Sequence, residues 1–163
     1  MKPASIHEIR QQLSQQSHEE LMDLLLRLAR FKQENKALLS YQLFDAVDED
    51  AYISQTLAEI REAFIDINPA PYLAKKTIRK AIRMVNRSIK YSGKPATEVA
   101  LLIGWMDTLF QSEVMIHASP VILNLVKGIF KRAQKAFDLL HEDLQYEYRS
   151  ALEKSKQWLE GKV

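Results

Sequence analysis

The chain has 163 residues, of which 47% are hydrophobic and 27% are charged, with only four glycines and five prolines. This length and balance predict one folded domain with a sizeable core, and they exclude a wholly disordered chain. The absence of cysteine excludes disulfides, thiolate nucleophiles and cysteine metal ligands.

Two capping boxes mark the starts of the first two predicted helices. Ser5 and Glu8 stand three residues apart, as do Ser17 and Glu20, and apolar residues follow each pair at helical spacing. The apolar stretch after the second box is broad, which predicts a helix buried on more than one side. A polar break then precedes a short third helix, predicted over residues 38–47.

Three prolines divide much of the remaining chain into long helices. The acidic residues 48–50 suit the start of a helix, because negative charge there meets the positive end of the helix dipole. Pro71, Pro95 and Pro120 then each begin a predicted helix of about 20 residues, some 30 Å long. A last helix is expected over residues 141–160.

Short polar turns between the predicted helices indicate antiparallel neighbours. We therefore predict an all-α fold of about seven helices in a single domain over residues 1–163. Its helical hairpins would be stacked as an irregular bundle or a short α-solenoid with HEAT-, armadillo- or TPR-like geometry. Gly104 and Gly128 lie inside two predicted helices, which predicts close helix–helix approach at both.

The longest apolar run, Val99–Met106, is too short to span a membrane, because a spanning helix needs about 20 residues. The first residues also lack the apolar stretch of a signal peptide. A soluble cytoplasmic protein without a membrane partner is therefore the expectation.

The helix predicted after Pro71 carries the strongest functional signal. Residues 71–95 contain eight cations and no acid, whereas residues 1–70 contain seven cations and twelve acids. The helix has a narrow apolar stripe and ends at Gly93, a residue suited to a left-handed cap. Seven cations gather on its other side: Lys75, Lys76, Arg79, Lys80, Arg83, Arg87 and Lys90.

A cationic helix face of this kind suits the backbone phosphates of nucleic acid, which require charge and hydrogen-bond donors. Tyr72, on the same side, offers a surface on which a base could stack. Two alternatives remain open. The cations form a solvated surface, or they pair with acids of the preceding helix, of which Glu59, Glu62 and Asp66 are suitably spaced.

Two pairs of residues have the helical spacing of metal ligands. They are Glu113 with His117 and Asp138 with His141, and neither belongs to the two Glu-x-x-His units of a di-metal site. We predict that these are surface or helix-cap residues, with no bound metal. Phosphate-binding loops, nucleophile elbows and metalloprotease motifs are absent from the sequence, so we predict no catalytic residues, no cofactor and no enzymatic activity.

Three segments resemble a family of small all-helical bacterial proteins that has no assigned activity. They are LRLARFKQENKALL at 26–39, IKYSG at 89–93 and LHEDLQY at 140–146. The resemblance implies a compact bacterial helical domain and transfers no functional residue.

These observations together predict a non-enzymatic binding or scaffold protein. Its cationic helix, between residues 75 and 94, would face an anionic partner such as nucleic acid or an acidic protein surface. One alternative is a protein–protein interaction module that uses a groove of the helical stack, with the basic face incidental. The other is an enzyme without linear motifs. The sequence leaves the partner and the oligomeric state undetermined.

Overall fold

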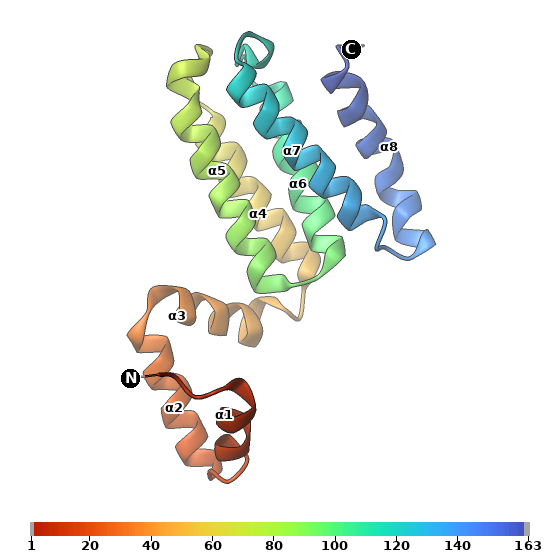
Figure 1. The fold of residues 1–163 in the computed structure, drawn as a ribbon. Coiled ribbons are helices and arrows are strands. Elements are labelled where there is room, and N and C mark those ends of the chain that lie inside the picture. Colours follow the sequence, from red (N-terminus) through yellow and green to blue (C-terminus); the bar gives the residue numbers. More distant parts are fainter. Residues whose placement is uncertain (1, 162–163) are drawn as a thin grey trace. The chain divides into compact units, whose positions relative to one another are not determined.

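The fold is described from a computed structural model for residues 2–161 (Figure 1). All regular structure in that range is helical, without a strand, which confirms the predicted all-α class. The range holds eight α-helices, where about seven were predicted. The elements are α1 (Ile6–Leu13), α2 (His18–Phe31), α3 (Gln33–Ser40), the π-helical turn η1 (Tyr41–Asp45), α4 (Glu49–Phe64), α5 (Pro71–Ser92), α6 (Pro95–Gln111), the 3-10 turn η2 (Ile116–Ala118), α7 (Pro120–Phe137) and α8 (Glu142–Leu159).

The chain divides into two compact units, Met1–Phe44 and Asp45–Val163. The first contains α1 to α3 and the second contains α4 to α8. The single domain expected over residues 1–163 stays a prediction.

The N-terminal unit confirms the predicted helix starts but not the predicted burial. Ser5 and Ser17 both form complete capping boxes with the glutamate three residues on. No residue of α1, α2 or α3 is buried, and Phe31 is 85% exposed. The expectation that α2 is buried on more than one side was therefore wrong, because three short helices are too few to enclose so broad an apolar surface. The third helix also begins earlier than predicted, at Gln33.

Helix α6 lies at the centre of the C-terminal unit, where it packs against α4, α5, α7 and α8. It is apolar on most of its sides, and Trp105, Met106 and Leu109 are fully buried. Consecutive helices alternate in direction, so α5 and α7 run the same way in front of α4 and α6 (Figure 1). The predicted antiparallel packing of neighbouring helices is confirmed.

The two glycines inside helices have opposite surroundings. A Cβ added to Gly104 of α6 would lie 2.5 Å from Cδ2 of Leu57 in α4, so this glycine does permit close packing of two helices. A Cβ added to Gly128 of α7 would meet no atom within 4 Å, and the residue is exposed. Close helix–helix approach at Gly128 was therefore a wrong prediction.

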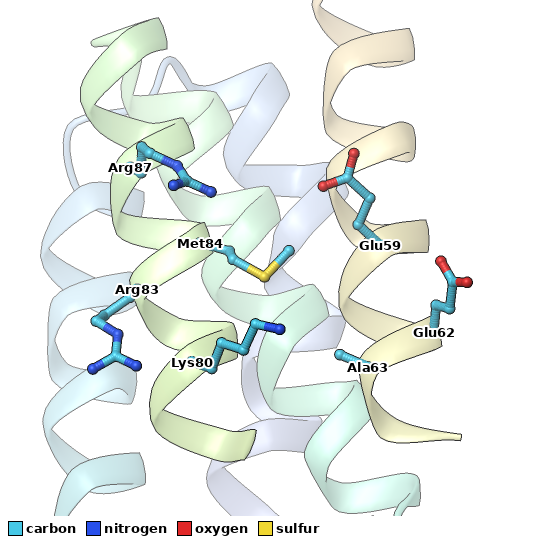
Figure 2. Close-up of a pocket in the computed structure, with 7 residues that line it drawn as sticks. All are labelled: Glu59, Glu62, Ala63, Lys80, Arg83, Met84 and Arg87. Atoms are coloured by element: carbon cyan, nitrogen blue, oxygen red, sulfur yellow. The ribbon is translucent and has the colours of Figure 1, made fainter. Parts of the chain in front are cut away.

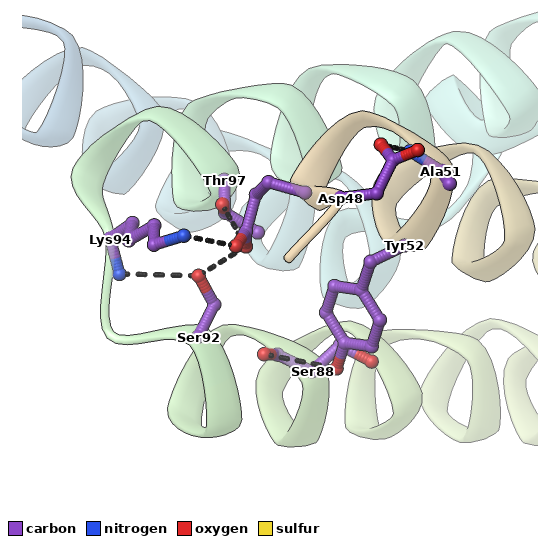
Figure 3. Close-up of polar contacts among 8 residues, drawn as sticks. Asp48, Ala51, Tyr52, Ser88, Ser92, Lys94 and Thr97 are labelled. Atoms are coloured by element: carbon purple, nitrogen blue, oxygen red, sulfur yellow. Dashed lines mark hydrogen bonds and ion pairs between the residues drawn. The ribbon is translucent and has the colours of Figure 1, made fainter. Parts of the chain in front are cut away.

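A polar network joins the start of α4, the end of α5 and the start of α6 (Figure 3). The Glu49 carboxylate accepts hydrogen bonds from Ser92 Oγ at 2.5 Å and from the fully buried Thr97 Oγ1 at 2.6 Å. Lys94 Nζ forms an ion pair with the other Glu49 oxygen at 2.5 Å. One side chain thus fixes three helix ends together.

Candidate anion-binding face

Helix α5 is built from the signals recognised in its sequence. Pro71 occupies its first turn, and Gly93 ends it with a φ of 66°, in the left-handed region. One side of the helix enters the core of the C-terminal unit, through the buried residues Ala74, Ile78, Ala81, Ile82, Val85 and Ile89. The predicted apolar stripe is confirmed, and its burial leaves the opposite side of α5 outside the core.

The seven predicted cations of α5 all lie outside the core. Lys75 is half-buried, and six are exposed: Lys76, Arg79, Lys80, Arg83, Arg87 and Lys90. Within residues 2–161 none of the seven forms an ion pair at 4.0 Å or less. The alternative in which they pair with Glu59, Glu62 and Asp66 is therefore not found in the structure. We name these seven side chains the α5 cationic face.

The α4 edge of this face is not purely cationic. A groove of about 470 Å³ runs between α4 and α5, lined by Glu59, Glu62, Ala63, Lys80, Arg83, Met84 and Arg87. Figure 2 shows the Lys80 and Arg87 side chains extending toward α4, and Arg83 pointing away from it. Glutamates therefore moderate the positive potential at the α4 edge.

The opposite edge of the face meets α7 through one arginine. Arg132 of α7 donates from Nη1 to Asn86 Oδ1 of α5 at 2.5 Å, and it also forms an ion pair with Glu98 of α6. Beyond this bridge α7 exposes three lysines, Lys127, Lys131 and Lys135. We did not predict these lysines as site residues. The absence of any acid from residues 120–137 was a signal that could have indicated them.

The histidines with metal-ligand spacing have structural roles. The His117 ring stacks on the Trp158 ring with centroids 4.7 Å apart. His141 caps α8, where Nδ1 accepts a hydrogen bond from the Asp143 backbone N–H at 3.5 Å. Across the described range, no three His, Asp or Glu side chains gather in a metal-binding arrangement.

Two further findings bear on the class of protein. Among the described helices, none combines the length and the apolar character needed to cross a bilayer. Comparison of the chain with protein-family models, with curated proteins and with solved structures finds no match in any of the three.

Proposed function

We propose that the chain is a non-enzymatic binding protein whose α5 cationic face contacts an anionic partner. The partner is nucleic acid or an acidic protein surface. The supporting observation is that six of these seven side chains are exposed and that none of the seven has a carboxylate partner among the described residues. Such cations are available to an incoming anion, and the counterions that a polyanion releases on binding them favour the complex.

The arrangement of α5 supports the same proposal. The helix is anchored by its buried stripe and by the Glu49 network at its end, so its cations are displayed from a rigid support. Because the helix is already folded, no backbone has to be ordered when the partner binds, and that part of the entropy cost is avoided.

The test is binding of a labelled nucleic acid of mixed sequence across a range of salt concentrations. If four or five phosphates are engaged, log affinity falls with log salt at a slope of roughly −4. The charge-reversed variant Arg79→Glu, Arg83→Glu, Arg87→Glu is expected to lose this binding. Poly-glutamate, as a second probe, represents an acidic protein surface.

The matched control introduces three glutamates on α8 instead, in place of the exposed residues Arg149, Lys154 and Lys156. This variant has the same change in net charge and is expected to retain most of the affinity. Loss of affinity that is equal in both variants would show a dependence on net charge alone. Full affinity in the α5 variant for both polyanions would remove the proposal.

A further inference from the structure

We propose that the anion-binding surface continues from α5 across α7, and that its partner is duplex nucleic acid held through its phosphates. This inference rests on the proposed function, because it names the partner and the extent of the same surface. It adds three binding residues, Lys127, Lys131 and Lys135.

The first support is the charge of α7. Its three lysines are exposed, and in the described part of the chain none of them has an ion-pair partner. The residues of α7, like those of α5, include no aspartate or glutamate. Nine exposed cations and two half-buried ones, Lys75 and Arg132, therefore occupy two helices that have no carboxylate of their own.

The second support is that the two helices are neighbours. Both pack against α6, they run in the same direction, and the Arg132–Asn86 hydrogen bond joins them (Figure 1). Glu98 of α6, an acid at this junction, is already paired with Arg132. The positive charges of α5 and α7 therefore add together along their shared side.

The third support is size. Lys76 and Lys90 are separated by about 21 Å along the α5 axis, at 1.5 Å per residue. A duplex carries one negative charge per about 1.7 Å with both strands counted, so a length of about 21 Å contains roughly 12 phosphates, of which those on one side can meet the protein.

The fourth support is Gly128, which has no packing role. A glycine inside a helix costs about 1 kcal/mol relative to alanine, and a Cβ here would meet no atom within 4 Å. Gly128 lies three residues before Lys131 and seven before Lys135, so the three share one side of α7. A bare backbone at this point allows a phosphate chain to approach the helix closely.

The composition of the surface favours a duplex over the other polyanions. Seven of its ten cations are lysine, a residue that is depleted in protein–protein interfaces. Single strands are held mainly by stacking on aromatic side chains, and Tyr72 is the one exposed aromatic residue of α5 and α7. Contacts with the phosphates of a duplex can be made by lysine and need no aromatic side chain.

The test compares three neutralised variants of the full chain by fluorescence anisotropy with a labelled duplex. The α7 variant is Lys127→Gln, Lys131→Gln, Lys135→Gln, and the α5 variant is Lys76→Gln, Arg83→Gln, Lys90→Gln. The control is Arg149→Gln, Lys154→Gln, Lys156→Gln on α8. Helical circular dichroism checks that each variant is folded.

We expect the α7 variant to lose about 10²-fold or more in affinity at about 0.1 M salt, and its salt slope to flatten by about 2.7. The α5 variant should lose a similar amount, and the α8 control should change little. Duplex DNA and duplex RNA are tested separately, because their backbones offer the same phosphates. Gly128→Gln, which covers the bare backbone without changing charge, should weaken binding several-fold.

Other outcomes separate the two proposals. Wild-type affinity in the α7 variant, with loss in the α5 variant, overturns the extension across α7 and leaves the proposed function standing. Tighter binding of a single strand or of poly-glutamate than of duplex overturns the choice of partner alone. Wild-type protein that binds none of these polyanions overturns both proposals. Unchanged duplex affinity in Gly128→Gln overturns the close approach at that residue.

Discussion

At the residue scale, the two helical glycines form a natural pair for measuring packing. Gly104→Ala would place a methyl group 2.5 Å from a Leu57 methyl, whereas the same change at Gly128 meets open space. We expect Gly104→Ala to lower the free energy of unfolding by about 1–3 kcal/mol through overpacking. Gly128→Ala should raise it by about 0.5–1 kcal/mol, because alanine is the better helix former.

Urea denaturation of both glycine variants measures these changes. Because the two substitutions are chemically identical, a difference in sign between them isolates the contact with Leu57. A stabilised Gly104→Ala would show that the Leu57 side chain can move aside at no cost, contrary to the close packing described.

Asp107 on α6 is expected to make stability depend on pH. Burial raises the pKa of its carboxyl above the usual value, and the positive charges of Lys154 and Arg61 offset part of that rise. The pKa of Asp107 is therefore higher in the folded chain than in the unfolded chain, so ionising it costs stability. That cost is absent below the unfolded pKa and is present in full above the folded pKa.

Asp107→Asn removes this cost, so the variant should melt at a higher temperature than wild type near neutral pH. At a pH below about 3, the Asp107 carboxyl is protonated in both the folded and the unfolded chain. The melting temperatures of the variant and of wild type should converge there. Thermal melts across this range measure the difference, with the exposed Asp66→Asn as control. A variant less stable than wild type at neutral pH would show that the attraction of Lys154 and Arg61 outweighs burial.

At the element scale, the Glu49 network decides how three helix ends meet. Glu49→Ala removes the acceptor of Ser92 and of the fully buried Thr97, and it removes the partner of Lys94. We expect the free energy of unfolding to fall by about 1–3 kcal/mol. The buried Thr97 hydroxyl would then have neither its acceptor nor water to bond with, which destabilises the folded state.

Chemical denaturation of Glu49→Ala beside the exposed Glu153→Ala tests the role of this network. The control should change stability by less than about 0.5 kcal/mol. Adding Thr97→Val to Glu49→Ala should recover part of the loss, because valine has no hydroxyl to satisfy. An additive loss in that double variant would contradict the assigned contact.

At the scale of the whole molecule, the two units are expected to differ in local stability. No residue of α1 to α3 is buried, whereas α6 alone contains eight buried residues in the C-terminal unit. Amides that are protected only by helical hydrogen bonds exchange through local opening, without unfolding of a core.

We therefore predict that amide hydrogens of α1 to α3 exchange with solvent much faster than those of α6. Hydrogen exchange followed by mass spectrometry measures this directly in the full chain. Protection in α2 equal to that in α6 would show that the apolar faces of the N-terminal unit are covered in solution.

Local signals in the sequence were sufficient to predict where most helices begin and which side of α5 carries the cations. Capping boxes at Ser5 and Ser17, the prolines that begin helices and the glycine that ends α5 act within a few residues, so they can be recognised without the fold. The side of α5 that carries Lys76 and Arg83 follows from helical periodicity alone. The same local signals could not show that α2 lacks a buried residue, because burial depends on what packs against a helix.

The sequence by itself determined the all-α class, most helix boundaries and which side of α5 is cationic, because these depend on residues within one or two turns of each other. The tertiary structure alone decided that Gly104 packs against Leu57 while Gly128 faces open space. It also decided that the α5 cations lack carboxylate partners among the described residues, and that Arg132 joins α7 to α5. Those facts depend on distances between helices that are far apart in the chain, and no periodicity within one helix contains them.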